Sequence, residues 1–69
     1  MKTDDELKPG DFIDVLEAHR FGLDRWVSAE VVTVEAHSIG ARFMAGASVG
    51  ALIALERHTE NRLWKRANV

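Results

Sequence analysis

The chain has 69 residues, of which 46% are apolar and 29% are charged, and it contains no cysteine. This length allows one compact domain with a small core, and the lack of cysteine excludes a disulfide framework, a thiolate metal site and a thiol redox motif. Nine of the apolar residues are alanines, so few large side chains remain for the core. Self-association is one way in which such a domain gains stability.

The charges are distributed unevenly along the chain. Residues 1–35 carry four Lys/Arg and nine Asp/Glu, a balance of −5, whereas residues 36–69 carry five and two, a balance of +3. This asymmetry suits an acidic partner or head-to-tail self-association. The alternative is a fold that interleaves the two halves and mixes their charges on its surface.

The sequence shows no targeting or membrane-spanning pattern. Its first six residues are acidic and polar as a whole, where an export signal needs a basic start and an apolar run. Its longest apolar stretch, 51–55, is far below the ~20 residues of a membrane span. We therefore expect a cytoplasmic protein without membrane contact, and the short chain rich in Ala, Val and Arg suits a bacterial or phage protein.

A first strand is predicted close to the start of the chain. Residues 1–8 are expected to form a flexible, charged lead-in, and 9–11 (PGD) are a turn signal because proline presets φ and glycine supplies a permissive position. β-Branched and aromatic residues then favour a strand at 12–18. Residues 19–25, with a central glycine and no periodicity, are expected to form a loop.

The clearest strand covers residues 26–36. Its first half alternates apolar with polar or aromatic residues and gives one apolar face, but Val32 and Val34 fall on the opposite face. We predict a bulge or a sharp bend near Val32, because either would reconcile the two halves. The next segments are a turn, an alternating strand and a loop: 37–38, 39–44 and 45–50.

Two structures are compatible with residues 48–67. Leucines at partly helical spacing indicate a helix, but Gly50 would lie in its first turn. The alternative is a hairpin with strands at 51–57 and 62–66, joined by a polar loop of common length. We favour the hairpin, because short strands at regular spacing with turn signals between them indicate a small all-β barrel.

The predicted core contains residues from all strands except the last, and leaves both tryptophans near the surface. It consists of Phe12, Ile13, Val15, Val27, Ala29, Val31, Ile39, Ala41, Phe43, Leu52, Ile53 and Leu55.

Three short motifs mark these strands: PGD at 9–11, WVSAEVV at 26–32 and IGARF at 39–43. Together they resemble an SH3-like small barrel of the Tudor and Agenet kind. The resemblance covers residues 9 to about 66 and implies a five-stranded barrel domain over 9–69 that acts as an interaction module. At 44–46 the sequence Met-Ala-Gly stands where the family has Asp-Tyr-Gly, so one usual wall of the methyl-lysine cage is missing.

The polar residues show no catalytic or metal-binding pattern. The histidines at positions 19, 37 and 58 lack the i, i+4 spacing of a helical metal site, and no serine is flanked by a nucleophile-elbow motif. We therefore expect no enzymatic activity, no bound metal and no cofactor.

The aromatic residues are the candidates for a partner-binding site: Phe21, Trp26, Phe43 and Trp64. Trp26 is predicted on the polar face beside the loop that holds Phe21, and exposed aromatic rings bind cations, bases or apolar side chains. Phe43 is most simply a core residue. The alternatives are that Trp26 covers an open barrel end and that Trp64 packs inward beneath arginine stems.

Two functions follow from these residues. The first is a non-enzymatic module that binds a protein or peptide through surface aromatics, including self-association into a homo-oligomer. The second is nucleic-acid binding with Trp64 stacking on a base, as the same kind of barrel binds RNA in translation and transcription-elongation modules. Its basic residues would be Arg42, Arg57, Arg62, Lys65 and Arg66. We favour protein binding, because the pI near 5.8 lies below the basic balance usual for nucleic-acid binders.

Overall fold

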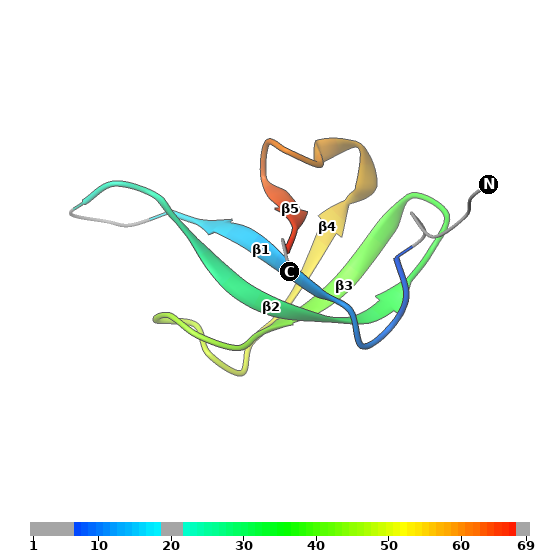
Figure 1. The fold of residues 1–69 in the computed structure, drawn as a ribbon, viewed down its shortest axis with the longest axis horizontal. Helices are drawn as coiled ribbons and strands as arrows, with labels where there is room; N and C mark the ends of the chain where they lie inside the picture. The colour runs from blue at the N-terminus through cyan, green and yellow to red at the C-terminus, as the bar shows by residue number, and fades with distance from the viewer. Residues whose placement is uncertain (1–6, 19–21, 68–69) are drawn as a thin grey trace.

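A computed structural model describes residues 7–18 and 22–67 of the chain. Within these residues the chain forms one antiparallel sheet of five strands in the order β4-β3-β2-β1-β5. The elements are β1 (Phe12–Glu17), β2 (Arg25–Val34), β3 (Ser38–Phe43), β4 (Leu52–Glu56), the short 3-10 helix η1 (Arg57–Thr59) and β5 (Trp64–Arg66). Figure 1 shows a strongly curved sheet, with η1 on the connection from β4 to β5. The predicted small all-β fold of five strands is confirmed.

The chain enters β1 through a tight turn. The Asp11 N–H donates to the Lys8 carbonyl oxygen at 3.0 Å, and Gly10, the third residue of the turn, has a φ of 97°. Proline second and glycine third with positive φ define a type II turn. The Gly10 N–H also donates to the Val31 carbonyl oxygen at 2.8 Å. The predicted turn is confirmed, and it fixes the start of β1 against β2.

The core lies on the inner, concave side of the sheet and follows the alternation of the strands. Its buried apolar residues are Leu7, Ile13, Val15, Val27, Ala29, Val31, Ile39, Ala41, Phe43, Leu55 and Trp64. The prediction that Phe12 and Leu52 are core residues is wrong: they are 56% and 69% exposed. Each precedes an inward-facing isoleucine in its strand, so alternation turns it to the outer face.

Leu7 extends this core beyond the strands. The sequence places it in the flexible lead-in 1–8, but the structure buries it to 6% exposure within the core cluster. The prediction is therefore wrong at this residue. The remainder of the lead-in up to residue 6 lies outside the described residues.

The predicted bulge is present in β2. Val31 pairs with Ala41, but the next pair along the strands is Thr33 with Gly40, so Val32 is the extra residue. The shift allows Val34 to pair with Ile39 and pack against the core. The change of face in the apolar alternation of residues 26–36 thus marks a β-bulge in the structure, as predicted.

The C-terminal third contains two strands, which excludes the helical alternative, but they do not form the predicted hairpin. β4 pairs with β3, whereas β5 pairs with β1, so the two strands lie at opposite ends of the sheet order. The cause is visible at the end of β4. The Glu56 carbonyl oxygen accepts hydrogen bonds from Thr59 Oγ1 at 2.6 Å and from Trp64 Nε1 at 3.1 Å. These bonds and the buried indole direct the chain from the end of β4 to β1.

Among the described residues, none belongs to a helix with the length and apolar character that a membrane crossing requires.

Candidate functional site

The four aromatic residues predicted to bind a partner do not share one surface. Trp64 and Phe43 are 1% and 7% exposed and belong to the core, so the prediction that they offer binding surface is wrong. Trp64 is opposite Val15, an inward residue, and directly opposed residues of a strand pair share a face. Phe21 lies outside the described residues. Only Trp26 keeps an accessible ring among the three that are described.

Trp26 lies on the outer face, where the alternation of β2 predicts it. It is 38% exposed and lies opposite Leu16 of β1. The Nζ atom of Lys65 is 4.6 Å from the centroid of its ring, a cation–π distance. Lys65, predicted to contact nucleic acid, is therefore already engaged with an aromatic ring of the same chain.

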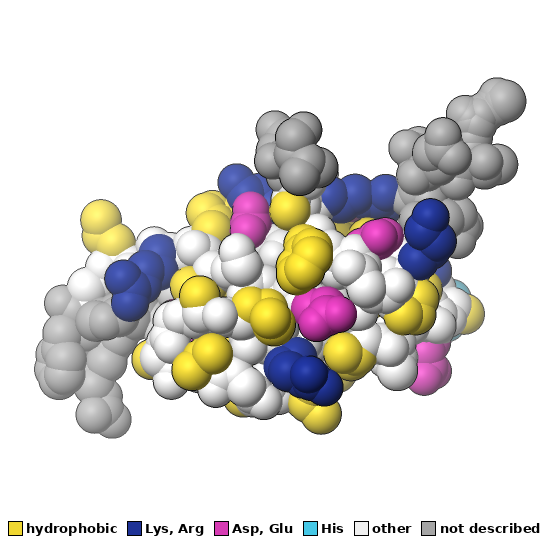
Figure 2. Space-filling view, turned by 60° about the horizontal axis from the view of Figure 1, so that its bottom comes forward, with side chains coloured by type: hydrophobic (Ala, Val, Ile, Leu, Met, Phe, Trp, Pro, Cys, Tyr) yellow, Lys and Arg dark blue, Asp and Glu magenta, His cyan; other side chains and the backbone are white. Residues whose placement is uncertain are grey.

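Four side chains form a row across the outer face of the sheet, which we call the outer row. Phe12 is opposite Glu30, Glu30 is opposite Arg42, and Arg42 is opposite Leu52. The row therefore runs apolar, acidic, basic, apolar over β1, β2, β3 and β4. Figure 2 shows a face on which hydrophobic side chains surround neighbouring acidic and basic ones.

The sequence does not identify three of these residues as site candidates: it predicts Phe12 and Leu52 in the core and gives Glu30 no role. Strand alternation is the signal that could identify Phe12 and Leu52, because strands that turn Ile13 and Ile53 toward the core turn the neighbouring side chains to the outer face. The row, however, depends on the register between strands, which strand periodicity alone does not specify.

The basic residues predicted for nucleic-acid binding are divided among several parts of the surface. Arg42 lies in the outer row, Lys65 contacts Trp26, and Arg62 is exposed before β5. Of the five, only Arg57 and Arg66 line one pocket. The structure therefore brings together a pair of arginines rather than a basic stripe.

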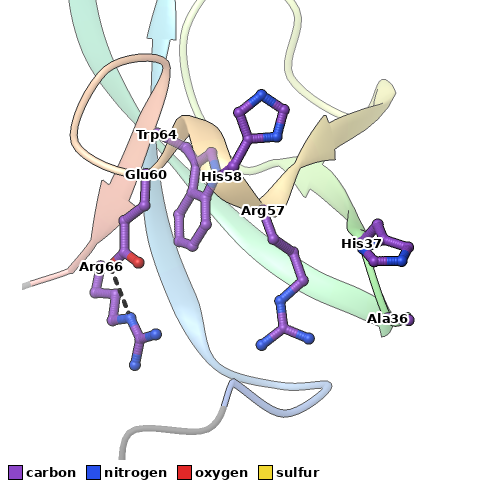
Figure 3. A pocket seen from close by; sticks show the side chains of 7 residues that line it. All are labelled: Ala36, His37, Arg57, His58, Glu60, Trp64 and Arg66. Carbon is purple, nitrogen blue, oxygen red and sulfur yellow. Dashed lines mark hydrogen bonds and ion pairs between the residues drawn. The ribbon is translucent and has the colours of Figure 1, made fainter.

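This pocket, which we call the basic pocket, lies among η1, β5 and the β2–β3 turn and has a volume of about 360 Å³. Its lining residues are Ala36, His37, Arg57, His58, Glu60, Trp64 and Arg66. In Figure 3 the side chains of Arg57 and Arg66 extend past the indole of Trp64, one on each side of it. Trp64 therefore packs inward beneath arginine side chains, which is the alternative interpretation of its sequence position. No local motif in the sequence signals that the two histidines and Glu60 join them.

Neighbouring groups hold both arginines of the basic pocket. Arg66 Nε donates to Glu60 Oε2 at 2.8 Å, and Arg57 Nη1 donates to the Glu35 carbonyl oxygen at 3.0 Å. His58 Nε2 lies 3.3 Å from Glu56 Oε1, and both side chains are largely exposed. Within residues 7–18 and 22–67, no three His, Asp or Glu side chains gather as a metal site requires.

Comparison of the chain with protein-family models, with curated proteins and with solved structures found no match. The resemblance to Tudor and Agenet barrels therefore stays a prediction. The functional argument rests on the outer row and the basic pocket.

Proposed function

We propose that this chain is a non-enzymatic interaction module that associates with a second copy of itself through the outer face of its sheet. The observation that carries the proposal is the outer row. Its two ends, Phe12 and Leu52, are large apolar side chains more than half exposed, and its two central residues carry opposite charges. Exposed apolar surface of this kind is typical of protein interaction sites.

The outer row is complementary to itself. A two-fold axis that runs along the strands, between β2 and β3, lays the row over a second copy in reverse order. Glu30 then faces Arg42 of the second copy, and Phe12 faces Leu52 of the second copy, each twice. An interface with this symmetry requires one patch that fits its own image, and the apolar, acidic, basic, apolar order supplies it.

Burial of the row ends favours association energetically. Complete burial of a Leu or Phe side chain contributes roughly 1.5–3 kcal/mol, and the interface buries four such side chains. The net charge of −2 keeps repulsion between two copies small. The core of this short chain is small, so the additional burial is valuable for stability.

Charge exchange within the outer row tests the proposal. We expect the wild type to sediment as a dimer, whereas Glu30→Arg or Arg42→Glu alone gives a monomer because like charges then face each other across the interface. An equimolar mixture of the two single variants restores the dimer, since one chain then carries two positive charges in the row and the other two negative. The double variant E30R/R42E restores it alone.

The control addresses stability of the monomer. Glu30 and Arg42 are cross-strand neighbours, so each single variant also loses about 0.2–1 kcal/mol within one chain. Circular dichroism shows whether the variants remain folded. A wild type that sediments as a monomer, or a mixture of folded variants that stays monomeric, contradicts the proposal.

The nucleic-acid alternative has weaker support. It requires basic and aromatic groups along one accessible surface. Trp64, its stacking residue, is buried, and its basic residues lie on different elements and faces. We therefore do not propose it.

A further inference from the structure

The basic pocket has an excess of positive charge that self-association does not use. Its lining contains two guanidinium groups, two imidazoles and one carboxylate, and it carries a net charge of +1 even with both histidines neutral. None of its residues belongs to the outer row. This lining favours an anion over a cation, independently of what covers the outer face.

Both guanidinium groups are pre-positioned. Arg66 is held by the Glu60 carboxylate, and Arg57 is held by a backbone carbonyl oxygen. The carbonyl group is neutral, so this contact orients Arg57 without cancelling its charge. Each guanidinium carries five N–H donors in a fixed fork that matches phosphate oxygens. Side chains that are already ordered lose less entropy when a ligand binds.

The pocket also has a rigid apolar wall. The indole of Trp64 is buried to 1% exposure, and its Nε1 is hydrogen-bonded to the Glu56 carbonyl oxygen. A wall that cannot rotate away excludes water from one side of the ligand, which strengthens charge-assisted hydrogen bonds on the other.

Size and charge restrict the ligand to a small anion. The volume of about 360 Å³ lies near the lower end of the roughly 300–1,000 Å³ of small-molecule pockets. The net negative charge of the chain disfavours a polyanion, whereas two arginines beside one pocket suit a single dianionic group. We propose that the basic pocket binds the phosphate group of a small phosphate monoester.

Titration with AMP, inorganic phosphate and adenosine, followed by nitrogen–proton NMR, tests this site. The Trp64 indole N–H signal is the reporter, and the Trp26→Phe variant distinguishes it from the signal of Trp26. We expect AMP and inorganic phosphate to shift the Trp64 signal saturably in the millimolar range or below, whereas adenosine does not. A lack of saturable shift with both phosphates, or an equal response to adenosine, overturns the proposal.

Three variants locate the binding. Arg57→Gln removes one guanidinium, and we expect AMP affinity to fall about tenfold or more, as for loss of a hydrogen bond to a charged group. Arg62→Gln is the matched control, because it removes the same charge from the same connection without lining the pocket, and affinity should not change. Glu60→Gln removes the carboxylate from the lining, so AMP affinity should rise, an effect that structural damage does not produce.

Two further outcomes decide against the pocket. Equal weakening by Arg57→Gln and Arg62→Gln means diffuse attraction rather than a site. Tighter binding of a short single-stranded oligonucleotide without a terminal phosphate than of AMP means a nucleic-acid surface instead. The folded state of each variant is read from the same spectra, so a loss of binding is not confused with unfolding.

Discussion

At the scale of single residues, the carbonyl oxygen of Glu56 is the point where the C-terminal third is organised. It accepts hydrogen bonds from Thr59 Oγ1 and Trp64 Nε1. Thr59 and Trp64 are buried, whereas Glu56 itself is exposed. One backbone acceptor thereby ends β4, closes η1 and positions the start of β5. Trp64 is then both the largest fully buried side chain and a wall of the basic pocket.

The two tryptophans should therefore respond differently to the same substitution. We expect Trp64→Phe to lower the free energy of unfolding by about 2 kcal/mol, because it leaves a cavity and removes the bond to Glu56. Trp26→Phe keeps an aromatic ring for Lys65 on the outer face and should cost about 0.5 kcal/mol or less. Urea unfolding measures both. Equal losses contradict the assignment of Trp64 to the core.

At the scale of elements, the bulge in β2 depends on a glycine in the neighbouring strand. Gly40 of β3 is opposite Thr33, the first paired residue after the bulge. A Cβ atom at position 40 would lie 2.6 Å from Thr33 Oγ1, closer than non-bonded atoms approach. The absence of a side chain at Gly40 thus allows the bulged strand to remain paired.

This arrangement predicts coupling between Gly40 and Thr33. We expect Gly40→Ala to destabilise the fold by about 1 kcal/mol or more, because the threonine side chain must shift. In a Thr33→Ala background the same change should cost less, since the conflicting oxygen is gone. A double-mutant cycle measured by urea unfolding should give an interaction energy of about 1 kcal/mol. Additive losses show that the contact has no energetic effect.

The element scale also shows how far the sequence predicts this fold. Local signals predict the strands, the turn at Pro9-Gly10 and the bulge at Val32, because each depends on alternation or on a residue with restricted φ. The partners of β4 and β5 are not predicted, because pairing is decided by the buried Trp64, which could equally have been exposed in a hairpin. The candidate sites are still less predictable: the outer row depends on register and the basic pocket on three separate segments.

At the scale of the whole molecule, the two proposed binding regions use different residues and different surfaces. The outer row crosses four strands on the outer face, whereas the basic pocket lies among η1, β5 and the β2–β3 turn. The division of acidic and basic charge between the halves of the sequence does not persist, because β1 and β5 pair directly and place Asp14 opposite Lys65. Self-association and anion binding can thus be tested separately.

Self-association should make the thermal stability depend on protein concentration. A dimer that dissociates on unfolding gains stability by mass action, so Tm should rise as the wild type is concentrated. Leu52→Ser removes an exposed end of the outer row and should abolish this dependence, while it changes the Tm of the dilute protein little. Leu63→Ser, at another exposed leucine outside the row, is the control and should retain the dependence. Calorimetric scans over a concentration series measure the difference, and a wild-type Tm independent of concentration contradicts association.

The pairing of β5 with β1 has a consequence for the order of events during folding. β1, β2 and β3 each pair with the next strand along the chain, so the contacts of β1 to β4 form by closing short loops. Val15 and Trp64, in contrast, meet from nearly opposite ends of the described chain, and closing so long a loop costs more chain entropy. We therefore expect the four-stranded meander to assemble first and β5 to dock last. The burial of Trp64, and with it the basic pocket, would then be completed only at the final step.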